Sequence, residues 1–300
     1  MIELKNTVKK FGDFTALDDI TLTIPEGTAF GLLGSNGAGK STLLRLLTGI
    51  YSPDGGTVQL DGKDVFNNEE QKRRVFFVND ETVQFGSFTL KGLKDYYKGF
   101  YPNFSEDIYK KLVDTVKLPE NKKIDTFSKG MKRQAIVIVG LACCTEYLLL
   151  DEAFDGLDPT MRIIVKHMLV DAMLDRKLTV VISSHNLKEI NEVCDTAALM
   201  HQGKIIFSRE LDSVKGDIHK IQVSFPEEHN REEFECEELL HFERSGSIYY
   251  MIMRGSEENI KEKISCFSPV VFDVIPLTLE EIFIYEMEVL GYDANGIEKE

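Results

Sequence analysis

A glycine-rich segment that ends in Lys, Ser and Thr is where residue types and spacing point most directly to chemistry. The segment reads Gly34, Ser35, Asn36, Gly37, Ala38, Gly39, Lys40, Ser41, Thr42. Its glycines let backbone N–H groups curve around phosphate oxygens. Lys40 can then reach the β- and γ-phosphates of a nucleotide, and the Ser41 hydroxyl can ligate Mg²⁺. We therefore predict that residues 34–42 bind the phosphates of a nucleotide, with Mg²⁺ as the metal.

Two adjacent carboxylates follow an apolar run later in the chain. Residues 147–150 read Tyr-Leu-Leu-Leu and lead directly into Asp151 and Glu152. A buried strand would place Asp151 at its carboxyl end, near Mg²⁺, and Glu152 one residue nearer the γ-phosphate. Glu152 is then the candidate general base for an attacking water. A core strand that merely ends on solvated acids is the simpler alternative, and the phosphate loop disfavours it.

A Ser-Lys-Gly triplet precedes this strand. Ser128 can cap a helix that begins at Lys129, and Gly130 permits close backbone approach. The start of such a helix can bind a phosphate group. Taken alone, this pattern is more often an ordinary helix cap.

Two further polar residues and one aromatic residue complete the candidates. His185 ends the apolar run 180–182 and its two serines, and Asp158 lies seven residues after Asp151. Near the N-terminus, Phe11 precedes Ala16 in a segment where an aromatic ring could stack on a nucleotide base. An incidental surface aromatic remains an alternative for Phe11.

In their order along the chain, the motifs resemble those of ABC ATPases, over residues 1 to about 215. The segment from Phe127 to Met131 is similar to the Leu-Ser-Gly-Gly-Gln signature of that family. The resemblance implies a head-to-tail dimer of this chain with itself or with a homologous ATPase. ATP would be held by residues 34–42 of one protomer and by Ser128 and Gly130 of the other. The resemblance further implies that His185 bonds the γ-phosphate, that Asp158 lies at the dimer interface, and that Phe11 and Ala16 contact the adenine.

The chain departs from the family pattern at several positions. Lys129 replaces the first signature glycine, and Met131 replaces the glutamine. Asp80 stands at the position of the metal-binding glutamine after a short strand, with Asn79 and Glu81 as rivals. These differences leave phosphate contact intact and leave the metal geometry open.

The elements that must position these residues indicate an α/β fold of the P-loop NTPase, ABC type. Residues 21–24 and 57–60 read as strands of a small N-terminal antiparallel sheet. Apolar runs at 29–33, 147–150, 179–182 and 197–200 suit a parallel sheet covered by helices on both faces. A helical subdomain is expected over about 86–130.

The last part of the chain differs in charge. From Gly216 onward there are 7 basic and 20 acidic residues, out of 35 basic and 50 acidic in the whole chain. We expect an ABC ATPase domain at 1–215 and a small α+β domain at 216–300, with strands at 220–225, 248–254 and 270–275. Its last helix, 279–290, begins after a capping box formed by Thr278 and Glu281.

Composition excludes several classes of protein. The formal net charge of -15 argues against a nucleic-acid partner. Five cysteines without Cys-x-x-Cys spacing predict neither a disulfide framework nor a structural metal, and the adjacent Cys143 and Cys144 are expected to pack in the core. The longest apolar run, 135–144, is too short to cross a membrane.

The expected function is that of the ATP-binding subunit of a transporter, most similar to Gram-positive ATPases of the YtrB type. The resemblance implies ATP hydrolysis coupled to export through a separate integral membrane permease, at the cytoplasmic face of the cell membrane. A non-transport ABC ATPase that acts on a soluble partner is the alternative. The acidic tail is either a solvated appendage or a dimerisation or regulatory domain, the latter suggested by the apolar stripe Leu279, Ile282, Phe283, Met287 and Leu290.

Overall fold

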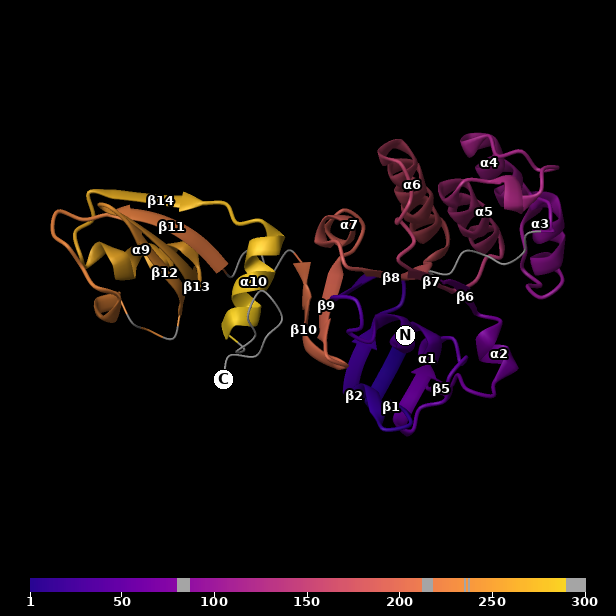
Figure 1. The fold of residues 1–300 in the computed structure, drawn as a ribbon, viewed down its shortest axis with the longest axis horizontal. Helices are drawn as coiled ribbons and strands as arrows, with labels where there is room; N and C mark the ends of the chain where they lie inside the picture. The colour runs from indigo at the N-terminus through magenta and orange to yellow at the C-terminus, as the bar shows by residue number, and fades with distance from the viewer. Residues whose placement is uncertain (80–86, 212–217, 235, 237, 290–300) are drawn as a thin grey trace. The chain divides into compact units, whose positions relative to one another are not determined.

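A computed structural model describes the protein over residues 1–79, 87–211, 218–234, 236 and 238–289 (Figure 1). The chain falls into two compact units, Met1–Ser208 and Arg209–Glu300. None of the helices in the described ranges is long and apolar enough to span a lipid bilayer. Asp80 and Glu81 lie outside the described residues.

The first unit opens with an antiparallel sheet in the order β2-β1-β4-β5. Its strands are β1 (Ile2–Phe11), β2 (Phe14–Ile24), β4 (Gly55–Leu60) and β5 (Lys63–Asp64). The alternation of apolar and polar residues in these strands turns one face inward. That face buries Ile2, Leu4 and Leu22 in the same apolar cluster as Leu43 and Leu47 of helix α1 (Lys40–Leu47).

A six-stranded sheet in the order β10-β9-β3-β8-β7-β6 forms the centre of this unit. Its strands are β3 (Ala29–Leu33), β6 (Val75–Val78), β7 (Tyr147–Asp151), β8 (Thr179–Ser184), β9 (Thr196–His201) and β10 (Lys204–Glu210). Strands β6, β7, β8, β3 and β9 pair in parallel. Every residue of β3, β7 and β8 is buried, as expected for strands covered on both faces. The predicted α/β fold is confirmed.

Helices cover both faces of this sheet. In Figure 1, α1 and the antiparallel sheet lie on one side, and α5, α6 and α7 lie on the other. The helices of this unit beyond α1 are α2 (Glu69–Lys72), α3 (Leu90–Lys98), α4 (Glu106–Val116), α5 (Lys129–Ala142), α6 (Pro159–Arg176) and α7 (Leu187–Asn191), with a 3₁₀ turn at Ile124–Thr126. Helices α3 and α4 fall within the range expected for a helical subdomain.

The second unit contains an antiparallel sheet in the order β12-β13-β11-β14. Its elements are β11 (Ile218–Ser224), β12 (Leu239–Ser245), β13 (Ile248–Arg254), β14 (Val271–Ile275), α9 (Glu257–Ser265), α10 (Leu279–Val289) and a 3₁₀ turn at Arg231–Phe234. An apolar core between the sheet and α9 includes Val223, Tyr249, Met251, Ile260 and Ile264. This unit therefore has a core of its own.

Helix α10 begins with the predicted capping box. The Thr278 N–H donates to Glu281 Oε2 at 2.9 Å, and the Glu281 N–H donates to Thr278 Oγ1 at 3.3 Å. Ile282 and Phe283 of the expected apolar stripe are buried. The Tyr285 ring lies 5.3 Å from the ring of His241 on β12. Burial removes Ile282 and Phe283 from the surface on which a dimer partner could dock.

Candidate functional site

The phosphate loop connects β3 to α1, as its motif requires. Lys40, the first residue of α1, is buried, and its Nζ donates to the carbonyl oxygens of Gly34 at 2.7 Å and Ser35 at 3.2 Å. The N-cap residue of α1 is Gly39, and no side chain of the described residues caps this helix, so its first N–H groups keep the capacity to bind an anion. The loop thus places a cation and free helix donors at the carboxyl end of β3.

Gly39 shows why this loop needs glycine. Its φ of 107° lies in a region that residues with a Cβ rarely adopt. A Cβ at this position would also lie 2.9 Å from the carbonyl oxygen of Ala16. The end of the phosphate loop therefore packs directly on Ala16, one of the residues expected to contact the nucleotide.

Asp151 is the last residue of β7, in the same sheet as β3, from which the phosphate loop leaves. Parallel pairing places it opposite Ser183 of β8, and Ser183 Oγ donates to Asp151 Oδ1 at 2.6 Å. The other oxygen, Oδ2, is buried and has no hydrogen-bond partner among the described residues. A buried carboxylate is costly unless a cation or donor compensates its charge. This unpaired oxygen suits a carboxylate that holds Mg²⁺, directly or through water.

Glu152 stands between the other two residues predicted to act in catalysis. Its Oε1 lies 3.4 Å from Lys40 Nζ, and its Oε2 lies 2.9 Å from His185 Nδ1. The Glu152 side chain is 13% exposed, whereas that of His185 is 56% exposed. The fold therefore brings Lys40, Glu152 and His185 into one cluster that opens to solvent on the His185 side.

The backbone of Glu152 is unusual. Its φ of 48° lies in the left-handed region, which costs a non-glycine residue about 1–2 kcal/mol. The Glu152 N–H donates to both Oγ and the carbonyl oxygen of Ser183, each at 3.2 Å. Strand β8 thus holds the turn in which the carboxylate leaves the sheet.

Ser128 and Asp158 each cap a helix. Ser128 accepts a hydrogen bond from the Met131 N–H at the start of α5, and Asp158 accepts one from the Met161 N–H at the start of α6. Gly130 lies in the first turn of α5. The simple capping role considered for Ser128 is present in the structure, and it leaves open a further role in phosphate binding.

Phe11 lies at the end of β1 in the hairpin with β2. Its ring is 44% exposed and packs edge-on against Tyr51, with centroids 5.3 Å apart. Lys9 Nζ lies 5.4 Å from the Phe11 ring centre. Phe14, its partner across the hairpin, is more exposed still and was not singled out in the sequence. Both rings are accessible for stacking.

Arg133 is a residue that motif reasoning missed. This arginine on α5 is buried, and its Nη1 donates to the Asn79 carbonyl oxygen at 2.5 Å. The bond joins α5 to the segment that follows β6. Local sequence provided no clear signal for it, because Arg133 stands beside Lys132 and Gln134 in the polar first part of α5, where an arginine is normally exposed.

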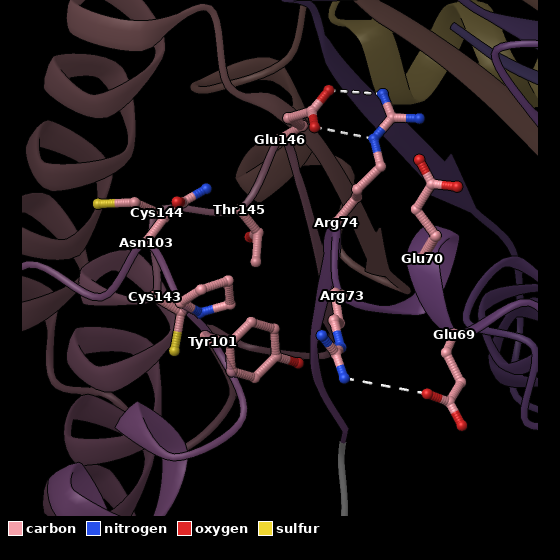
Figure 2. A pocket seen from close by; sticks show the side chains of 11 residues that line it. Glu69, Glu70, Arg73, Arg74, Tyr101, Asn103, Cys143, Cys144, Thr145 and Glu146 are labelled. Atoms are coloured by element: carbon pink, nitrogen blue, oxygen red, sulfur yellow. Dashed lines mark hydrogen bonds and ion pairs between the residues drawn. The ribbon is translucent and has the colours of Figure 1, made fainter.

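A separate pocket of about 380 Å³ lies at the opposite ends of the strands, where β6 and β7 begin. Figure 2 shows Arg74 paired with Glu146, and the distances are 2.8 and 2.5 Å. Arg74 also contacts Asp61. Burial raises the pKa of Asp61, but hydrogen bonds from the Met1 ammonium, Arg74 and Tyr147 outweigh it and lower the pKa to about 2. These charges are mutually compensated.

Comparisons with known proteins agree with the site. A family model described as ABC transporter matches residues 17–155. The chain is similar to the ABC transporter ATP-binding protein YtrB of Bacillus subtilis, with 31% identity over 95% of this chain and 97% of that protein. It is 30% identical to the ATP-binding protein NatA of Bacillus subtilis, over 71% of this chain and 91% of NatA.

Solved structures show the same fold. An ATP-binding subunit of an ABC transporter has a TM-score of 0.66 at 23% identity and covers 72% of this chain and 92% of its own. A dimeric ATP-binding cassette in a post-hydrolysis state with ADP and phosphate has a TM-score of 0.63 at 22% identity, covering 70% and 99%.

Proposed function

The chain belongs to the ATP-binding proteins of ABC transporters, and we propose that it hydrolyses ATP within a head-to-tail dimer through Lys40, Glu152 and His185. The contact of Glu152 with both Lys40 and His185, beside the phosphate loop, carries this assignment. Lys40 supplies a cation, Glu152 a candidate base and His185 an imidazole. We expect the γ-phosphate of a nucleotide bound by residues 34–42 to lie beside these three side chains.

Lys40 is the residue placed to neutralise phosphate charge. Its Nζ now contacts two loop carbonyls and Glu152, so a γ-phosphate would compete with Glu152 for the same ammonium. If the γ-phosphate displaces Glu152 from Lys40 Nζ, Glu152 Oε1 becomes free to accept a proton from the attacking water. His185 Nδ1 would stay with Glu152, so its Nε2 is the ring nitrogen available to a phosphate oxygen.

Mg²⁺ is the second component of the proposed site. When bound, it would neutralise negative charge on the β- and γ-phosphate oxygens. Ser41, next to Lys40, and Asp151, with its unpaired Oδ2, are the residues proposed to hold it. Asp80 is proposed as a third contributor from outside the described residues.

The other half of each site would come from a second protomer. We propose that Ser128 and Gly130 at the start of α5 bind the γ-phosphate of ATP held by the partner, with Asp158 at the interface and Phe11 and Ala16 at the adenine. The dimeric cassette among the similar structures supports this arrangement. Each chain alone would then have half of two sites.

Transport requires a membrane partner. We propose that the chain works at the cytoplasmic face of the cell membrane with a separate integral permease and drives export. Similarity to a Nod factor export protein of Burkholderia lata supports export, and similarity to a lantibiotic transport protein of Streptococcus pyogenes supports transport. The names of these relatives favour transport over action on a soluble partner.

ATP turnover by the purified chain tests the assignment. Glu152→Gln should lower kcat by about 10²-fold or more, because general-base catalysis contributes about 10²–10⁴-fold, and it should retain ATP binding. Lys40→Ala should instead weaken ATP binding, measured by equilibrium binding of ATP with Mg²⁺. Glu70→Gln, an exposed acid far from the loop, is the control. If Glu152→Gln turned over ATP at an unchanged rate, Glu152 would not be the general base.

A further inference from the structure

The start of helix α5 packs tightly against the loop that follows β7. A Cβ added at Gly130 would lie 2.9 Å from the carbonyl oxygen of Gly156. That separation is too short for a real side chain, so glycine is required for the two backbones to approach this closely. The segment proposed to bind the partner's ATP therefore touches the loop proposed to lie at the dimer interface.

Lys129 adds a second contact between the same segments. Its Nζ lies 2.7 Å from Asp155 Oδ2, and the two side chains are 54% and 48% exposed. The aliphatic part of the Lys129 side chain packs against Gly156. A Cβ added at Gly156 would lie only 3.0 Å from Lys129 Cδ. The hydrogen bond from Lys129 lowers the pKa of Asp155 and keeps this carboxylate ionised. A glycine at position 129 could form neither contact.

Asp155 is connected in turn to the proposed catalytic base. Its N–H donates to the Glu152 carbonyl oxygen at 3.1 Å, which closes a tight turn at the end of β7. Glu152 enters that turn with a left-handed backbone, so its carboxylate position depends on the turn. A displacement of Asp155 would therefore move the backbone that carries Glu152.

We propose that Lys129 is a positioning residue that couples the two ATP sites of the dimer through Asp155. Lys129, Gly130, Asp155 and Gly156 form what we call the signature clasp. When Ser128 and Gly130 capture the partner's ATP, the clasp passes the displacement of α5 to Glu152 in the protomer's own site. This inference rests on the proposed function of the dimer.

An exposed ion pair without consequence is the competing explanation, since such pairs contribute little to stability. The two explanations differ in what they predict for turnover. An inert surface pair would affect neither kcat nor cooperativity. A clasp would affect both and leave ATP binding by residues 34–42 unchanged.

A double-mutant cycle on the full chain separates the two explanations. We expect Lys129→Gln and Asp155→Asn each to lower kcat by about two- to fivefold, the rate equivalent of a pair worth 0.5–1 kcal/mol, at unchanged ATP affinity. The kcat of the double variant should be no lower than that of either single variant. Lys129→Arg, which keeps the positive charge, should have the kcat of the unmodified chain. The Hill coefficient for ATP should drop toward that of independent sites in the Gln and Asn variants.

Lys63 and Glu70 provide a matched control. Lys63 Nζ lies 3.5 Å from Glu70 Oε1, and the two side chains are 57% and 73% exposed. Lys63→Gln and Glu70→Gln should leave kcat and cooperativity as in the unmodified chain. Additive effects at Lys129 and Asp155, or effects no larger than at the control pair, would overturn the clasp. Lack of ATP turnover in the unmodified chain would instead overturn the proposed function.

Discussion

At the scale of single residues, Glu152 combines a chemical role with a costly backbone. Its left-handed φ is held by the hydrogen bonds of its N–H to Ser183. Local strain of this kind persists where the surrounding structure over-determines it. Strands β7 and β8 provide that constraint, and the carboxylate consequently reaches Lys40 and His185.

This strain predicts a difference between two inactive variants. Glu152→Gly and Glu152→Ala both remove the carboxylate, but only glycine adopts positive φ without penalty. We expect the glycine variant to be more stable than the alanine variant by about 1 kcal/mol. Urea unfolding followed by circular dichroism measures the difference. Equal stability, or greater stability of the alanine variant, would show that the turn is unstrained.

The residues of the proposed catalytic site were singled out from the sequence, whereas several of their contacts could not be. Lys40, Asp151, Glu152 and His185 could be found because each ends or follows an apolar strand in a fixed order. The bonds of Ser183 to Asp151 and of Lys129 to Asp155 join residues 32 and 26 positions apart. Such pairings follow from strand register and helix placement, which local sequence does not encode.

At the scale of elements, helix α5 performs three tasks. Its first turn carries Ser128 as a cap, its second turn carries Arg133 to the Asn79 carbonyl, and its last part packs on β6. The last contact requires Gly140, since a Cβ there would lie 2.6 Å from the ring of Phe76. The last part of the helix is therefore packed closely on β6, far from its first turn.

Ser128 allows capping to be separated from phosphate binding. Ser128→Ala should destabilise the protein by about 1 kcal/mol because the cap is lost. Ser128→Asp keeps a capping oxygen but adds negative charge, so it should retain stability and lose ATP-dependent dimerisation. Thermal unfolding and size-exclusion chromatography with ATP provide the two measurements. Normal dimerisation of Ser128→Asp would argue against phosphate contact at this position.

Elements with a strong pattern were predicted and weak ones were missed. The runs that became β3, β7, β8 and β9 are almost wholly apolar, so their burial could be inferred. Strand β12 was not anticipated, because Leu239–Ser245 contains His, Glu and Arg and is only partly buried. Tertiary pairing with β13, rather than local preference, makes it a strand.

At the scale of the whole molecule, the two units have separate apolar cores. The core of the first includes residues from Ile2 to Met200, and that of the second includes residues from Ile221 to Ile264. The charge shift in the sequence begins at Gly216, whereas the units divide between Ser208 and Arg209. The similarity to NatA covers 71% of this chain and 91% of NatA.

Truncation tests this independence. A chain that ends at Lys215 should fold and bind ATP with the affinity of the full chain, since its core and phosphate loop are complete. Combined with Glu152→Gln, it should still dimerise with ATP, because Ile282 and Phe283 are already buried. Calorimetry and size-exclusion chromatography report the results. Loss of dimerisation in a folded truncated chain would assign that role to the acidic tail.

The position of β3 in the sheet has a consequence for how the protein is made. This strand is synthesised before both of its neighbours, because Phe30 pairs in register with Val181 on one side and Thr196 on the other. Strand pairings between residues far apart in the sequence form slowly. Until β8 and β9 have been synthesised, the apolar strand β3 lacks both of its neighbours. The nascent chain therefore cannot complete its phosphate loop until nearly all of the first unit has been synthesised. During that interval β3, whose residues are all buried in the folded protein, is an exposed apolar segment that a chaperone could bind.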